Sequence, residues 1–300
     1  MVYCSHTVCH GMTINIRLSK RAYYYTNMRG HSMNRTIISA FLAAGILLSA
    51  QCVGHAASSS IAYTKKWLCN TPVHVVTVNL NDPDIVVSTA VARRGIGSSE
   101  GFGSMLSRLS PAAAITGTYF CLNSLVPVGD IVVDGRTVNT GSVGTGICFT
   151  PDNILEFKPA GGRRDWTGYQ SVVCSGPNLV RNRIAYVTKR MEGFTSESLY
   201  RKASRTAVGI TKANKMLLVS VNQPIYMGTL AKIMKDLGAV NAANLDGGTS
   251  TALYCKGRVL SHPGRKLTNL IVVYESQKKF AAVRHRLAPS PVASGGNPRS

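Results

Sequence analysis

Short runs of apolar, often β-branched residues alternate with turn-forming residues along most of the chain. Residues 73–80 and 85–91 flank the cluster Asn81-Asp82-Pro83-Asp84, and this pattern predicts a β-hairpin. An Asp134-Gly135 turn between two β-branched runs predicts a second hairpin. Further strands are expected at residues 112–120, 131–133, 136–138, 147–150, 154–157, 216–221, 242–245, 252–254 and 270–274.

Two segments place apolar residues at helical spacing instead. Residues 102–109 predict a short helix that ends before Pro111. Residues 229–237 predict another, with Thr229 as its N-cap and Gly238 as its C-terminal stop. Many short strands with few helices indicate an α+β fold, a single domain around a twisted, mixed or mostly antiparallel sheet. Hydrophobic residues make up 45% of the chain, which is enough for a packed core.

The N-terminal segment has the pattern of an export signal. A basic residue, Arg35, precedes the apolar stretch 36–50, and the small residues of Gly54-His55-Ala56 offer a cleavage site. This stretch is shorter than the ~20 apolar residues of a typical membrane span. We therefore expect residues 1–57 to combine an over-extended start with a signal peptide, and the protein to be secreted or periplasmic. An uncleaved anchor remains the alternative.

The rest of the chain divides into a catalytic domain and a tail. We expect the domain at residues 58–275 and a basic, disordered tail at residues 276–300, which are rich in Pro, Ala, Ser and Gly. Five cysteines follow the signal, at positions 69, 121, 148, 174 and 255. Export makes disulfides plausible, but their pairing does not follow from the sequence.

Charge is strongly unbalanced, with 34 Lys and Arg against 13 Asp and Glu and a net charge of +21. Such an excess favours anionic partners, among them phosphodiesters, anionic glycans, lipid headgroups and nucleic acids. Export argues against nucleic acid. Membrane association is expected only through an uncleaved signal or the basic tail.

A single carboxylate stands out in residues 244–251, Asn-Leu-Asp-Gly-Gly-Thr-Ser-Thr. Here Asp246 lies in a glycine turn between two apolar segments, where the backbone leaves room for a ligand. An Asp-Gly pair can also simply close a type I′ hairpin, so the turn alone leaves both interpretations open.

Three further motifs accompany it. They are Thr116 to Phe120 (Thr-Gly-Thr-Tyr-Phe), Gly176 to Val180 (Gly-Pro-Asn-Leu-Val) and Arg205 to Gly209 (Arg-Thr-Ala-Val-Gly), and Asn269 precedes the last strand. In this order and spacing, the motifs resemble those of the phosphodiester glycosidase family over roughly residues 70–274. The main departure is Thr116, where the family commonly has Asn.

The resemblance implies a hydrolase that cleaves a sugar 1-phosphodiester, with a carbohydrate phosphodiester or anionic glycan as its substrate. Such a site needs a cation for the phosphate and a carboxylate for the sugar. Arg205 is the expected phosphate clamp, Asp246 the reactive carboxylate and Asp130, at the end of a predicted element, a second carboxylate. Substrate contacts are expected from Thr116, Gly117, Tyr119, Phe120, Thr206, Gly247, Gly248, Thr249, Ser250 and Asn269.

No cofactor is implied with certainty, although Asp246 could ligate a divalent cation, activate water or hold a sugar hydroxyl. The sequence shows no set of metal ligands, and it identifies neither the sugar nor the group on the other side of the phosphate. The alternative function is a non-catalytic binder of an anionic glycan or cell-envelope polymer, which the net positive charge would suit equally well.

Overall fold

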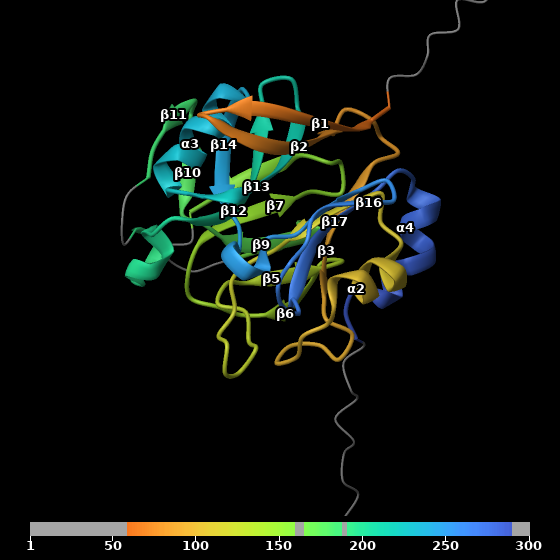
Figure 1. Cartoon of the computed structure of the whole chain (residues 1–300). Helices are drawn as coiled ribbons and strands as arrows, with labels where there is room; N and C mark the ends of the chain where they lie inside the picture. Colours follow the sequence, from red (N-terminus) through yellow and green to blue (C-terminus); the bar gives the residue numbers. More distant parts are fainter. Residues whose placement is uncertain (1–58, 160–164, 188–190, 290–300) are drawn as a thin grey trace, which may run out of the picture. The chain divides into compact units, whose positions relative to one another are not determined.

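Three sheets form the framework of this computed structural model, which describes residues 59–159, 165–187 and 191–289 (Figure 1). The predicted signal at residues 36–50 and the last residues of the predicted tail lie outside the described residues. Every strand pair in the described part is antiparallel, so the predicted α+β fold with a mostly antiparallel sheet is confirmed.

The seven-stranded sheet has the order β1-β2-β13-β12-β14-β10-β11. The β17 sheet has the order β16-β15-β4-β17-β3, and the β9 sheet the order β6-β5-β9-β7-β8. The strands are β1 Ile61–Leu68, β2 Thr71–Asn79, β3 Val86–Val91, β4 Ala113–Thr116, β5 Ile131–Val133, β6 Arg136–Asn139, β7 Thr145–Phe149, β8 Leu155–Lys158, β9 Ser171–Ser175, β10 Asn178–Arg181, β11 Ile184–Ala185, β12 Ala203–Thr211, β13 Lys215–Ile225, β14 Ala239–Asn244, β15 Leu253–Cys255, β16 Arg258–Ser261 and β17 Asn269–Tyr274.

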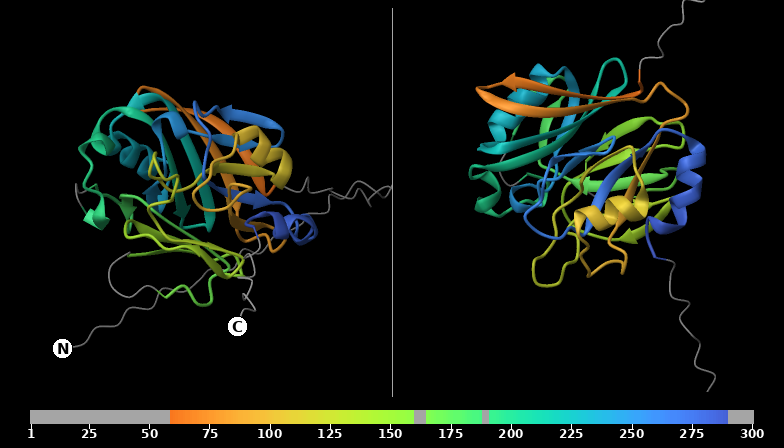
Figure 2. Two further views of the ribbon diagram at one scale, coloured as in Figure 1. Left: turned by 90° about the horizontal axis from the view of Figure 1, so that it is seen from below. Right: turned by 45° about the vertical axis from the view of Figure 1, so that its right-hand side comes forward.

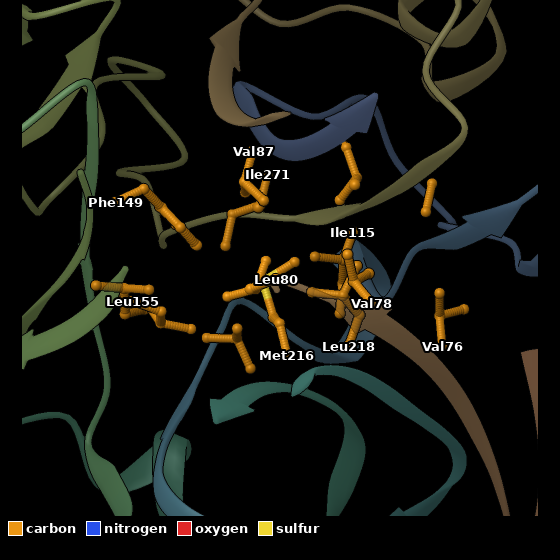
Figure 3. Packing of buried hydrophobic residues seen from close by; sticks show 14 of the residues in the cluster. Val76, Val78, Leu80, Val87, Ile115, Phe149, Leu155, Met216, Leu218 and Ile271 are labelled. Atoms are coloured by element: carbon orange, nitrogen blue, oxygen red, sulfur yellow. The ribbon is translucent and has the colours of Figure 1, made fainter. Parts of the chain in front are cut away.

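The main core lies where the three sheets meet (Figure 3). Met216 comes from the seven-stranded sheet, Ile115 and Ile271 from the β17 sheet, and Phe149 from the β9 sheet. All six residues of β17 are buried, as expected for a central strand that is covered on both faces.

Helices cover the outer faces of two sheets (Figures 1 and 2). Helix α3 (Met227–Asp236) packs on the seven-stranded sheet, while α2 (Phe102–Leu109) and α4 (Gln277–Val283) pack against the β17 sheet. Four 3-10 turns are described: η1 Met191–Gly193, η2 Glu197–Tyr200, η3 Gly248–Ser250 and η4 Arg284–Arg286. No helix in the described part of the chain is long and apolar enough to cross a membrane.

The periodic segments form the elements that their patterns predict. Helix α2 matches the predicted residues 102–109, and α3 begins two residues before the predicted Thr229. Strands β5 and β6 form the predicted hairpin around Asp134-Gly135, and β7–β8 and β12–β13 are also antiparallel pairs.

The predicted hairpin of residues 73–91 is wrong. Strand β2 already pairs with β1 along one edge and with β13 along the other, so neither edge is free for β3. The turn at Asn81 to Asp84 instead carries the chain into the β17 sheet, where β3 pairs with β17.

The predicted tail also differs, because its first part folds. Ser276 caps helix α4 by accepting a hydrogen bond from the Lys279 amide, 3.2 Å away. Phe280, Val283 and Leu287 are buried in the cluster that α2 shares with the β17 sheet. The folded domain therefore extends to at least residue 289, beyond the predicted boundary at 275.

Candidate active site

Asp246 lies where the chain crosses from one sheet to another. It follows β14 in the seven-stranded sheet and precedes β15 in the β17 sheet. Because the two strands belong to different sheets, Asp246-Gly247 does not close a hairpin. The hairpin alternative for this motif is therefore wrong.

Hydrogen bonds hold the Asp246 backbone between two other motifs. Its amide donates to the Gly117 carbonyl at 2.9 Å, and the Thr206 hydroxyl donates to its carbonyl oxygen. At the next residue, a Cβ on Gly247 would lie 2.7 Å from the Ser204 carbonyl oxygen, so only glycine fits without displacing β12. The structure thus brings three of the four motifs together around one carboxylate.

The Asp246 carboxylate is buried, with only 4% of the residue exposed. Its Oδ1 accepts a hydrogen bond from the Gly247 amide at 2.9 Å, and Arg265 Nη2 lies 3.6 Å from Oδ2. Burial raises the pKa of Asp246 to about 6, and the Ser250 hydroxyl, the Arg265 charge and the Gly247 amide limit that rise. This carboxylate can change its protonation state close to neutral pH.

Arg265, which the sequence analysis did not identify, is the nearest cation. It lies in the loop between β16 and β17, and its Nε donates to Ser250 Oγ at 2.6 Å. The guanidinium carbon lies 4.9 Å from the centre of the Phe120 ring, within cation–π range. A hydrogen bond of 2.8 Å from the Gly264 amide to the Thr249 carbonyl ties this loop to the Asp246 motif.

Arg205, the predicted clamp, lies on β12 and is 2% exposed. Its Nη2 donates to the Leu199 carbonyl at 2.9 Å and to the Arg201 carbonyl, and its Nε donates to the Ile225 carbonyl at 3.4 Å. Burial lowers the pKa of Arg205, while the nearby Tyr119 opposes that change. Much of this guanidinium is therefore used to position residues 199–201.

One cavity of about 570 Å³ is lined by both Arg205 and Asp246. Tyr119, Phe120 and the glycines of the Asp246 motif, Gly247 and Gly248, contribute to its wall, and segment 193–199 covers another side. Asp246 is the one acid among the described residues that line it.

Tyr119 connects the cavity to the Gly-Pro motif. Its hydroxyl donates to the Gly176 carbonyl at 2.8 Å and accepts a hydrogen bond from Asn244 Nδ2. The Gly176-Pro177 peptide bond is cis, and the Pro177 carbonyl accepts from the Asn244 amide at 3.0 Å. All four motifs therefore contribute to the site.

Several predicted contact residues lie behind the cavity wall. A Cβ on Gly117 would lie 2.0 Å from Asn269 Oδ1, and that oxygen accepts from the Thr118 amide at 2.7 Å. Thr116 is buried in β4. These residues position the Gly117-Thr118 backbone that supports Asp246. Thr206 likewise acts through its hydrogen bond to the Asp246 carbonyl, and Ser250 through the hydrogen bond it accepts from Arg265. Thr249 acts through its carbonyl, which accepts from the Gly264 amide.

Asp130, the predicted second carboxylate, does not line this cavity. Its Oδ1 accepts from the Gly141 amide at 2.6 Å and its Oδ2 from Trp166 Nε1 at 2.8 Å. These bonds hold the backbone at Gly141 and the Trp166 ring in place. Asp130 is therefore assigned no catalytic role.

Buried oxygens without a hydrogen-bond partner gather at the motifs. Of six such side-chain oxygens in the described residues, five belong to Thr118, Ser175, Asn244, Asp246 and Thr251. Buried polar atoms in proteins are normally paired, so these five oxygens are exceptions, and they belong to residues in or next to the motifs. No group of three or more His, Cys, Asp or Glu in the described residues could hold a metal ion, and Cys69, Cys121, Cys148 and Cys255 are free thiols.

A buried carboxylate with a pKa near neutral, one guanidinium beside it and another lining the same cavity are features typical of a candidate active site. The sequence pattern of the phosphodiester glycosidase family matches residues 110–274, more than half of the chain. The chain belongs to the phosphodiester glycosidase family, as its motifs predict.

Solved structures share the fold. A hypothetical protein from Synechocystis has a TM-score of 0.62 and 18% sequence identity, covering 72% of this chain and 62% of that one. The catalytic domain of zebrafish N-acetylglucosamine-1-phosphodiester alpha-N-acetylglucosaminidase, auto-inhibited by its pro-peptide, has a TM-score of 0.59 and 19% identity, covering 73% of this chain and 85% of that one. No curated protein sequence matches the chain.

Proposed function

We propose that this protein is an exported hydrolase that cleaves the bond between a sugar's anomeric carbon and the oxygen of a phosphodiester. The observation that carries the proposal is the Asp246 carboxylate, buried in a cavity lined by Arg205 and in contact range of Arg265. The family supports glycosidase chemistry on phosphodiesters, and this geometry supplies residues for it.

Arg265 is the better placed of the two arginines to bind phosphate. About a third of its side chain, 31%, is exposed, whereas Arg205 is almost fully buried and donates to three carbonyls. Guanidinium groups bind phosphate oxygens in a bidentate manner. We assign phosphate binding first to Arg265, with Arg205 contributing its positive charge from the cavity wall and shaping segment 199–201.

Asp246 acts as the base in this scheme. With a pKa of about 6, its carboxylate is mostly ionised at neutral pH. It takes a proton from a water molecule, whose oxygen forms the new bond to the anomeric carbon. The bond from that carbon to the phosphate oxygen breaks, and the electron pair leaves with a phosphate monoester. Because phosphate is already a good leaving group, a second carboxylate acid is not needed.

The sugar is proposed by similarity. The zebrafish relative is named for an N-acetylglucosamine 1-phosphodiester, so α-N-acetylglucosamine 1-phosphodiesters are the first substrates to test on this chain. Export rests on the apolar stretch at residues 36–50. N-terminal sequencing of the mature protein is expected to begin near Ser58, and a mature chain that retains residues 36–50 would contradict a cleaved signal.

Release of free sugar from a phosphodiester panel tests the function. The wild type should release sugar from a sugar 1-phosphodiester but much less from an ordinary alkyl glycoside, which has a poor leaving group. Asp246→Asn and Arg265→Gln should lose activity, while the exposed controls Asp236→Asn and Arg258→Gln should retain it. Binding of anionic glycan with no turnover of any phosphodiester would favour the non-catalytic alternative, which the net charge of +21 also suits.

A further inference from the structure

Both polar and apolar residues line the cavity. The polar lining includes Arg205, Asp246 and the hydroxyl-bearing residues of segment 195–198. The apolar lining comes from separate parts of the chain and includes Phe120 and Leu122. Val128, Val143, Phe194 and Leu199 complete that lining. Ligand pockets are commonly lined by apolar side chains, so the apolar residues are informative here mainly through their exposure and their place beside the candidate catalytic groups.

Leu122 is the most unusual member of this lining, because 65% of it is exposed although it lines the cavity. Two backbone hydrogen bonds order its loop. The Cys121 amide donates to the Val126 carbonyl at 3.0 Å, and the Leu125 amide donates to the Cys121 carbonyl at 2.8 Å. A further bond of 2.9 Å joins the Val128 amide to the Tyr119 carbonyl at the base of the loop. The fold thus holds a large apolar side chain in solvent at the edge of the site, where burial by a ligand would be favourable.

The contacts around Arg265 give the order of the groups. Its guanidinium is 3.6 Å from the Asp246 carboxylate and its central carbon 4.9 Å from the Phe120 ring centre. Arg265 does not itself line the cavity, but Asp246, Phe120 and Leu122 all do. A phosphodiester with its anomeric carbon at Asp246 and its phosphate beside Arg265 would therefore have Phe120 and Leu122 available for its second ester group.

We propose that this second ester group is an aliphatic alcohol, whose hydrocarbon chain lies against Phe120, Leu122, Val128 and Val143. This inference rests on the function proposed above and narrows its substrate class to alkyl phosphodiesters of a sugar. Other lining residues are closely packed: a Cβ on Gly193 would lie 2.8 Å from a Val143 methyl carbon, and Phe194 packs edge-on against Tyr119 with ring centres 5.6 Å apart.

Binding of alkyl phosphates tests the inference without requiring turnover. Ethyl, butyl and octyl phosphate and glycerol 3-phosphate are titrated into the wild-type protein by calorimetry. Affinity should rise by about tenfold or more from ethyl to octyl phosphate, because each buried methylene is favourable, and glycerol 3-phosphate should bind no better than ethyl phosphate.

Variants locate the effect. Leu122→Ser should weaken octyl phosphate binding by about fivefold and leave ethyl phosphate unchanged, whereas Arg265→Gln should weaken all four ligands. Val126→Ser, in the same loop but outside the cavity lining, is the matched control and should behave as wild type. Equal affinities along the series, absence of octyl phosphate binding, or unchanged octyl phosphate binding in Leu122→Ser would each overturn the inference.

Failure here is separable from failure of the proposed function. If the wild type cleaves the glycerol and ethyl esters of N-acetylglucosamine 1-phosphate as efficiently as the octyl ester, the hydrolase stands and the aliphatic subsite falls. If octyl phosphate binds as expected but no phosphodiester releases sugar, the subsite stands and the hydrolase falls.

Discussion

In the described part of the chain, the buried carboxylates of Glu100 and Asp246 each lie beside an arginine, and they differ in how completely they are satisfied. Glu100 lies 2.6 Å from Arg108 and also accepts hydrogen bonds from the Ser104 hydroxyl at 2.7 Å and the Arg93 amide at 2.9 Å. Although burial alone would raise the pKa of Glu100, these hydrogen bonds and the Arg108 charge lower it overall. Asp246 has a looser arginine at 3.6 Å and an Oδ2 atom without a hydrogen-bond partner, and its pKa is raised.

This difference separates a structural pair from a reactive one. Glu100 and Arg108 complete each other and join α2 to the end of β3, since Arg108 also donates to the Val91 carbonyl at 2.9 Å. Asp246 lines the cavity and keeps a buried Oδ2 atom without a hydrogen-bond partner. A perturbed, incompletely paired carboxylate in a cavity is the more informative sign of chemistry.

Activity should separate the two carboxylates most strongly. Asp246→Asn removes the base and is expected to lower kcat/KM for a sugar 1-phosphodiester by about a thousandfold. Glu100→Gln, assayed below its unfolding temperature, should stay within about threefold of the wild type because the residues to which Glu100 is hydrogen-bonded do not line the Asp246 cavity. A comparable loss in both variants would remove the distinction.

Stability should separate them in the opposite direction. Glu100→Gln leaves the Arg108 guanidinium buried without a charged partner, so the free energy of unfolding should fall by about 3–5 kcal/mol in urea titrations. The control is Asp134→Asn, which removes a carboxylate charge from the more exposed pair with Arg284. Its free energy of unfolding should change by less than about 1 kcal/mol. Equal effects would mean that the Glu100 pair is not structural.

The Asp246 carboxylate should cost stability as pH rises. Its pKa is about 6 in the folded protein against 3.8 when unperturbed, so between these values the folded state binds more protons than the unfolded state. Stability therefore falls as pH rises through this window, and Asp246→Asn should be up to about 3 kcal/mol more stable than the wild type at pH 7. The two proteins should converge near pH 4. A constant difference across this range would contradict a raised pKa.

Arg265 should set the pH range of catalysis. If ionised Asp246 is the base, kcat/KM falls on acidification with a midpoint near pH 6. Arg265→Gln removes a charge that lowers the pKa of Asp246, so this midpoint should move to higher pH in addition to any loss of rate. An unchanged midpoint would show that Arg265 does not act on Asp246.

Asp130 should have the smallest effect on activity. Asp130→Asn weakens the acceptor of the Gly141 and Trp166 hydrogen bonds, so a loss of about 1–2 kcal/mol in unfolding free energy is expected, with kcat/KM nearly unchanged. A thousandfold loss of activity in a folded Asp130→Asn protein would restore it as a second catalytic carboxylate.

Local sequence patterns predicted which segments form helices and strands better than they predicted which strands pair with each other. Helices α2 and α3 follow from apolar spacing, because one face of each is buried against a sheet. The pairing of β2 with β13 rather than β3 depends on contacts across the whole chain, which hydrophobic alternation does not encode. Helix α4 was missed because its apolar positions, Phe280 and Val283, stand in a strongly basic segment.

The site was predictable where a motif carried it. Asp246, Arg205, Tyr119 and Phe120 meet at one cavity, as the order of the motifs suggested. Arg265 was not predictable as a site residue, because an arginine after Pro263-Gly264 has no distinctive local pattern. Contacts formed on folding bring it to the carboxylate, among them the hydrogen bonds from Gly264 to Thr249 and from Arg265 to Ser250.

The bond that breaks is the most direct test of the central claim. Hydrolysis of an N-acetylglucosamine 1-phosphodiester is carried out in ¹⁸O-labelled water, and both products are analysed by mass spectrometry. Attack of Asp246-activated water on the anomeric carbon predicts that the label enters the sugar and that Asp246→Asn abolishes its appearance there. Label in the phosphate monoester would show phosphorus–oxygen cleavage and contradict the proposed glycosidase.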